Sequence, residues 1–194
     1  MKLKNIAYIG TGLVLNRKKA DKDDEIVKKY KIITLKSINN DGFIEKDLME
    51  EFESKEELSS NYISQKGDIV VRLSEPNTAA CIDKECEGVL IPSQFCLIRP
   101  NSLEYIPEYI AWYFNSQFVK KEISKAMVGS TLGIIKTGFI NELELNEISI
   151  EKQRIIADIA LLKKKEKELL QKLIKEKEIL YESVLNQIYE EEIN

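Results

Sequence analysis

The chain has 194 residues, of which 43% are hydrophobic and 32% are charged, and its formal net charge is −4. This length suits one domain with an appendage, and the raised charged fraction is typical of a long solvated helix. The absence of histidine excludes Ser-His-Asp and Cys-His catalysis and His-ligated zinc. The sequence has no membrane-length apolar run and no signal core, so we expect a cytoplasmic protein. We also expect no catalytic site and no metal site, because histidine is absent.

Charge is unevenly distributed along the chain. Residues 41–58 carry eight acidic and two basic side chains, whereas lysine and arginine cluster at 17–19, 28–36 and 120–136. Outside the acidic stretch, the first 150 residues are net positive, so an acidic total does not exclude a basic face that binds DNA. It does predict weak non-specific binding, because that binding scales with the number of phosphates neutralised.

The first 150 residues predict a mixed α/β domain. Apolar and β-branched runs indicate short strands at 30–35, 69–73, 79–82, 88–92 and 94–98. A turn is expected at 39–42, a partner strand from 43, a short surface helix within 47–60, a helix over 107–125, and a strand or connector over 139–150. The glycine-punctuated, polar segment 129–137 predicts a hydrogen-bonding loop.

Two residue groups in this domain are expected to be structural. Cys81, Cys86 and Cys96 are odd in number and form no C-x-x-C pair, so we interpret them as reduced thiols. The aromatic and aliphatic side chains of 107–125 recur at helical spacing and predict core packing rather than a base-stacking surface.

Residues 151–189 contain no glycine or proline and predict a long helix of ~57 Å. Its apolar residues follow a coiled-coil spacing that is interrupted at Glu166 and Glu176, with a second apolar track alongside. The residues expected to mediate dimerisation are Ile155, Ile159, Leu162, Leu169, Leu173 and Leu180. A domain of this size cannot cover the apolar face of so long a helix, and we therefore expect a partner helix. The alternative is a lone surface helix that frays at its acidic end.

Several segments, taken in order, resemble a known family. They are Ile6–Gly12, Tyr30–Leu35, Asn40–Ile44, Gly67–Arg72, Gly129–Thr131 and the Leu143–Leu145 stretch that leads into Ile150–Ile156 and the long helix. Their order and spacing resemble the specificity subunit of type I restriction-modification systems, in a form with one recognition domain and one helix. The expected fold is therefore α+β, with a target-recognition domain at 1–150 and a coiled-coil helix for dimerisation and spacing at 151–194.

The resemblance implies that two copies associate through antiparallel helices, so that each domain reads half of a split site on double-stranded DNA. It implies a methylation subunit as partner, which would carry the S-adenosylmethionine, with a restriction translocase as a further candidate partner. This chain would then hold no cofactor and would not be an enzyme by itself.

Readout of base edges needs Arg or Lys for guanine and Asn or Gln for adenine, with phosphate contacts for register. Residues of these types fall on the expected loops and basic clusters. The candidates for DNA contact are Arg72, Asn77, Thr78, Ser93, Gln94, Ser130, Thr131 and Lys136, with Lys18, Lys19 and Lys125 for phosphates. Solvated surface positions are the alternative interpretation of each.

Two other functions remain open from the sequence. The helix could pair with a full-length specificity subunit, which would make this chain a regulatory or exchange protein. Asp83 and Glu85 could hold Mg²⁺ in a divergent nuclease, although an acidic surface turn also explains them. The sequence contains no Asn-Pro-Pro-aromatic tetrapeptide of amino-methyltransferases and no Gly-Lys-Ser/Thr phosphate loop.

Overall fold

The computed structural model describes residues 1–21, 23–127 and 133–193, and the chain divides into two compact units, Met1–Ile156 and Ala157–Asn194. The first unit holds all the strands, which are β1 (Ala7–Thr11), β2 (Lys28–Ile32), β3 (Glu50–Ser54), β4 (Ile69–Arg72), β5 (Ala79–Cys81) and β6 (Phe95–Pro100). Its helices are α1 (Pro107–Asn115), α2 (Gln117–Met127) and α3 (Thr137–Glu142). The long helix α4 (Ile150–Ile193) begins in the first unit and makes up most of the second. These antiparallel sheets and the long helix confirm the expected α+β class.

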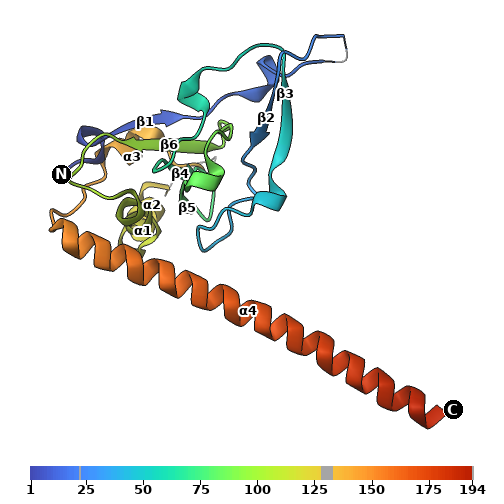
Figure 1. The fold of residues 1–194 in the computed structure, drawn as a ribbon. Coiled ribbons are helices and arrows are strands. Elements are labelled where there is room, and N and C mark those ends of the chain that lie inside the picture. The colour runs from blue at the N-terminus through green and yellow to red at the C-terminus, as the bar shows by residue number, and fades with distance from the viewer. Residues whose placement is uncertain (22, 128–132, 194) are drawn as a thin grey trace. The chain divides into compact units, whose positions relative to one another are not determined.

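A four-stranded antiparallel sheet in the order β1-β6-β4-β5 forms the centre of the first unit (Figure 1). Both of its faces are buried. Ile69 and Val71 of β4 pack into the core on the side of α1, α2 and α3, whereas Val70 packs into a core on the opposite face. Burial on both faces explains the unbroken apolar run at 69–71.

A second sheet pairs β2 with β3 and contributes a third, smaller core. Tyr30 lies opposite Phe52 in this pair, and both side chains are buried. The surface helix expected within 47–60 is therefore wrong, because a 3-10 turn at Lys46–Leu48 leads into strand β3 instead. Cross-strand packing of Phe52 and charge pairing with the lysines of β2 stabilise the extended form.

The helix expected over 107–125 is divided into α1 and α2 at Ser116, whose backbone is extended. The side-chain amide of Asn115 accepts from Ala79 N at 2.9 Å and donates to Ala79 O at 2.7 Å, so it pairs with the edge of β5. We attribute the end of α1 to this tertiary contact, which involves its last residue. Ile110 and Phe114 pack on the sheet, as expected for core side chains.

Three further expectations needed correction. Residues 88–92 form no strand, because Leu90 makes only isolated bridges to Ile32 and Ile63. The partner strand expected from residue 43 is β3 instead, and Ile44 forms a single bridge to Ile38. The segment 139–150, expected as a strand or connector, begins within helix α3, and its remainder up to α4 is the expected connector.

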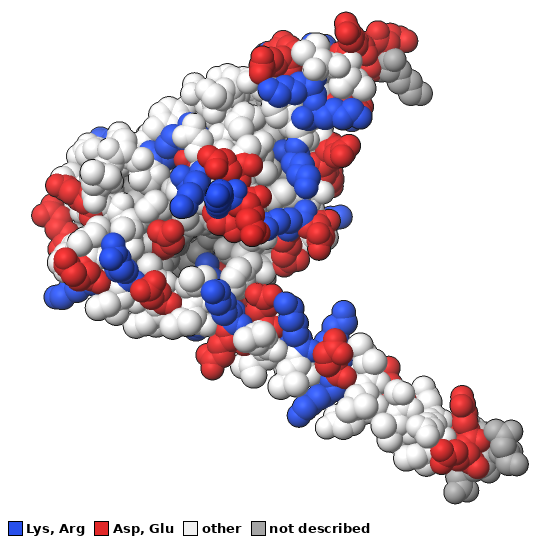
Figure 2. Space-filling view, in the orientation of Figure 1, with Lys and Arg blue, Asp and Glu red and all other residues white. Residues whose placement is uncertain are grey.

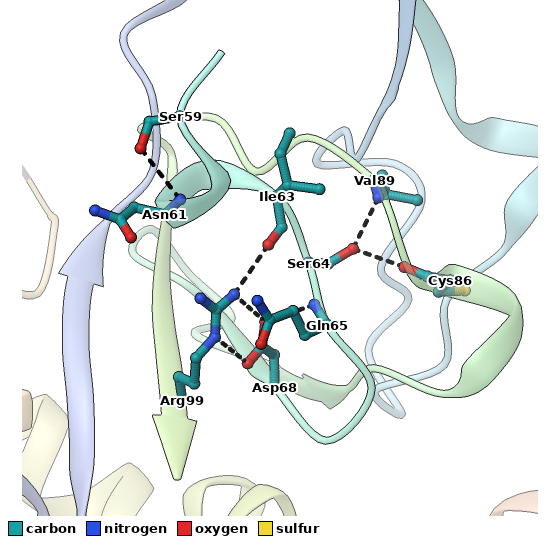
Figure 3. Close-up of polar contacts among 9 residues, drawn as sticks. All are labelled: Ser59, Asn61, Ile63, Ser64, Gln65, Asp68, Cys86, Val89 and Arg99. Carbon is teal, nitrogen blue, oxygen red and sulfur yellow. Dashed lines mark hydrogen bonds and ion pairs between the residues drawn. The ribbon is translucent and has the colours of Figure 1, made fainter. Parts of the chain in front are cut away.

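Two close contacts hold the sheet and its loops in place. Gly12 lies against the segment after Leu90, where an added Cβ would stand 2.3 Å from the carbonyl oxygen of Pro92. Asp68 accepts from Arg99 Nε and Nη2 at 2.8 Å each, and Arg99 also donates to the carbonyl of Ile63 at 2.9 Å (Figure 3). The Gly67-Asp68 pattern of the resemblance therefore has a structural role here, because Asp68 is 1% exposed and ties a loop to β6.

Candidate nucleic-acid interface

One end of the four-stranded sheet gathers several of the predicted DNA-contacting residues. Strand β4 ends at Arg72, which lies opposite Phe95, the first residue of β6. The amide of Leu73 donates to Gln94 O at 3.0 Å, and that of Ser93 donates to Leu13 O at 2.8 Å. The turn that joins β4 to β5 and the residues that precede β6 therefore lie side by side.

The β4–β5 turn is held from within by two of the predicted residues. Arg72 donates from Nη1 to Leu35 O at 3.3 Å and from Nη2 to Glu75 O at 3.2 Å. Asn77 has a φ of 54° and donates from Nδ2 to Leu73 O at 2.9 Å. Because Asn77 is only 3% exposed, its amide shapes the turn and is not presented to solvent.

Helix α2 secures the same turn from outside. Lys120 donates from Nζ to the carbonyls of Pro76 and Asn77, both at 2.7 Å. Burial lowers the pKa of the Lys120 ammonium to about 8. The predictions did not single out Lys120, although its place between the apolar residues Val119 and Ile123 was a signal that it faces inward.

The described part of the 129–137 loop runs beside this turn. Ile134 forms an antiparallel bridge with Ser74, and the amide of Ile135 donates to Leu73 O at 2.9 Å. Lys136 is exposed at the start of α3. Ser130 and Thr131 lie outside the described residues.

A cavity of about 500 Å³ opens beside the tip of the β4–β5 turn. It is lined by Asn40 from the 39–42 turn, by the tip of the β4–β5 turn, and by one face of α2. The lining residues are Asn40, Glu75, Pro76, Asn77, Lys120, Ile123, Ser124 and Met127. Of these lining segments, the β4–β5 turn is held by hydrogen bonds from Asn77 and Lys120.

The other predicted DNA-contacting residues differ in exposure. Thr78 is 2% exposed, Ser93 is half-buried and Gln94 is exposed. Lys125 is exposed on α2, where it pairs with Glu122 at 2.7 Å. Among the described candidates of this group, Gln94, Lys125 and Lys136 are exposed, whereas Arg72 and Ser93 are half-buried.

Lys18 and Lys19 lie elsewhere, beside β3. Lys18 pairs with Glu56, and Lys19 bridges to Ser54. The neighbouring Lys29 also pairs with an acid, since its Nζ lies 2.6 Å from Oε1 of Glu53. Figure 2 shows the two charge signs interspersed on this part of the molecule. The acidic stretch thus folds against the basic cluster of β2, where Lys28 and Lys29 pair with Glu57 and Glu53.

The acids of the nuclease hypothesis have structural partners. Asp83 Oδ1 accepts from the amides of Glu85 and Cys86 at 2.9 Å each, which caps a 3-10 turn, and Glu85 pairs with Lys46. Within the described residues, no three His, Cys, Asp or Glu side chains gather in a way that could hold a metal ion. Nor, in those same ranges, does any helix have the length and apolarity needed to cross a membrane.

Helix α4 exposes apolar side chains along its length. The six residues expected to mediate dimerisation are between 52% and 66% exposed. The second track is also exposed and consists of Leu170, Ile174, Tyr181, Val184 and Ile188. At the start of the helix, Gln153 is 1% exposed and bonds the backbone of Glu104, Ile106 and Ile148, which anchors the first turns to the first unit.

Comparison with protein-family models and with curated proteins finds no match. Solved structures do match. One is a chain from a study of complex assembly and conformational transition of the type I R-M system, with TM-score 0.63, 17% identity, and coverage of 88% of this chain and 43% of that one. The HsdS subunit from Thermoanaerobacter tengcongensis matches with TM-score 0.64 and 17% identity over 87% of this chain and 43% of that one.

A type I restriction-modification S subunit from M. genitalium matches with TM-score 0.56 and 14% identity, over 89% of this chain and 40% of that one. The chain therefore spans less than half the length of each of these structures. These matches cover most of this chain, which therefore has the fold of part of the specificity subunits of type I restriction-modification systems.

Proposed function

We propose that this chain is a DNA-recognition subunit of a type I restriction-modification system. Two copies would pair through α4 as a two-fold homodimer, and each first unit would read one half of a split site on double-stranded DNA. The observation that carries this proposal is the likeness in fold to specificity subunits. The exposed apolar side chains of α4 support pairing through that helix.

The proposal assigns the chemistry to a partner. A base must leave the stack before it can be methylated, and a methylation subunit that binds S-adenosylmethionine would perform that step. The present chain supplies sequence readout and position, and is not an enzyme by itself. A restriction subunit is a further proposed partner.

Charge along α4 supports antiparallel pairing of two copies. Residues 151–168 carry six basic and four acidic side chains, whereas residues 169–194 carry three basic and six acidic ones. Antiparallel alignment places the basic half of one helix beside the acidic half of the other, while parallel alignment places like charges together. A two-fold pair of identical readers matches a symmetric, interrupted DNA site.

The first test is the solution mass of the full chain compared with that of the double variant Leu169→Glu, Leu173→Glu. We expect a dimer for the wild type and a monomer for the variant, since buried carboxylates in the helix interface are costly. Lys175→Glu on the same helix is the control, and it should remain a dimer. A monomeric wild type would contradict the homodimer and favour pairing with a full-length specificity subunit.

The second test is selection of bound duplexes from a random-sequence DNA library by the wild-type dimer. The proposal expects enrichment of a symmetric motif with a gap of constant length. Recovery of no motif, with the dimer intact, would contradict a role in sequence recognition.

A further inference from the structure

The backbone at the tip of the β4–β5 turn is held by hydrogen bonds from side chains. Glu75 and Pro76 are exposed, whereas the next two residues, Asn77 and Thr78, are 3% and 2% exposed. The backbone carbonyls of residues 75, 76 and 77 all accept hydrogen bonds from cationic side chains, namely Arg72 and Lys120. Every carbonyl of the tip is therefore held in place before any ligand arrives.

The carboxylate of Glu75 stands apart from this network. Both cations donate to backbone carbonyls, and no side chain in the described part of the protein pairs with the Glu75 carboxylate. It lines the cavity that Asn40 and α2 border, so it is exposed at a concave surface. By contrast, Glu53 of β3 and the acids Glu56 and Glu57 that follow this strand are paired with lysines.

We propose that Glu75 is a specificity-determining residue that reads one base pair in each half-site. In the major groove a carboxylate accepts a hydrogen bond from an exocyclic amine, which is N4 of cytosine or N6 of adenine. This inference rests on the proposed function and names a contact of the same interface. The hydrogen-bonded backbone favours such a contact, because the main chain that carries Glu75 loses little freedom on binding.

An acidic reader has a thermodynamic signature that a solvated acid lacks. Near phosphates, its charge weakens binding to every sequence, because it opposes neutralisation of the backbone. Only the matching amine offsets that repulsion. Removing the carboxylate should therefore strengthen binding to unrelated DNA and, at the same time, abolish preference at one position.

The experiment compares base preferences of the wild-type chain and of Glu75→Ala, measured by selection from a random duplex library and by titration of single-site variants of the enriched motif. Preference at one base pair of each half-site should fall by about tenfold, with the other positions unchanged. The matched control Glu25→Ala removes an exposed acid in a loop away from the cavity and should keep every preference.

The variant Glu75→Gln distinguishes the two amines. A glutamine pairs with both N6 and N7 of adenine, so preference for adenine would persist, whereas preference for cytosine would change to adenine. Unaltered base preferences in Glu75→Ala would overturn the inference while leaving DNA recognition intact. If the wild-type chain itself selected no motif, the proposed function would fail, and this inference with it.

Discussion

Removal of the Arg99 guanidinium should destabilise the first unit strongly. The change Arg99→Met keeps an apolar stem of similar length and deletes three hydrogen bonds, two to Asp68 at 2.8 Å and one to the carbonyl of Ile63 at 2.9 Å. Asp68 is 1% exposed, and its carboxylate would keep the hydrogen bond from the amide of Gln65 at 2.7 Å.

The magnitude follows from the burial of Asp68. Breaking a buried ion pair costs about 3–5 kcal/mol, because the remaining charge is left desolvated. The side chain of Arg99 is 22% exposed, so we expect the lower part of that range. A loss of about 3 kcal/mol lowers the melting temperature of a domain of this size by roughly 6–12 °C.

Urea denaturation followed by circular dichroism measures the change. Lys29→Met is the control, because it breaks the Lys29–Glu53 pair, whose side chains are 59% and 41% exposed, and should cost no more than about 1 kcal/mol. Adding Asp68→Asn to Arg99→Met should recover part of the loss, since the unpaired charge disappears. Equal losses in Arg99→Met and in the control would refute the reasoning.

Three further outcomes are expected. Gly12→Ala should lower the free energy of unfolding by about 1–3 kcal/mol in urea, since its Cβ meets a backbone carbonyl at 2.3 Å; an unchanged midpoint would contradict that contact. Burial lowers the pKa of Lys120 to about 8, so between pH 8 and 10.5 the unfolded chain binds a proton that the native chain lacks. The free energy of unfolding of the wild type, relative to that of Lys120→Met, should therefore rise with pH over this window. A difference that does not change with pH would argue against a buried ammonium. Burial raises the pKa of Cys86 to about 11 and of Cys96 to about 12, so a thiol reagent at pH 8 should label Cys81 first in the native protein and all three only after unfolding.

Some features of this protein follow from local sequence alone. The run Ile69-Val70-Val71 predicts a buried strand because three successive apolar β-formers suit a sheet covered on both faces, and β4 confirms it. The stretch from 151 onward predicts a long helix because no glycine or proline interrupts it, and α4 confirms that as well. Dimerisation through its apolar face stays a prediction.

Tertiary contacts decided the rest. The acidic stretch becomes strand β3 rather than a helix because Phe52 packs on Tyr30 and the lysines of β2 neutralise its acids, and neither partner is local in the sequence. The helix at 107–125 breaks because Asn115 pairs with Ala79 on a distant strand edge.

The candidate interface shows the same division. Residue types suited to reading bases could be recognised from the sequence, but not the direction in which each side chain points. Arg72 and Asn77 have the chemistry of DNA contacts, yet in the fold both bond the backbone of their own turn, and the exposed tip presents Glu75 instead. Local patterns determine which segments form strands and helices, because period and propensity are short-range properties. Only the packed structure decides which polar groups satisfy buried carbonyls and which remain free for a ligand.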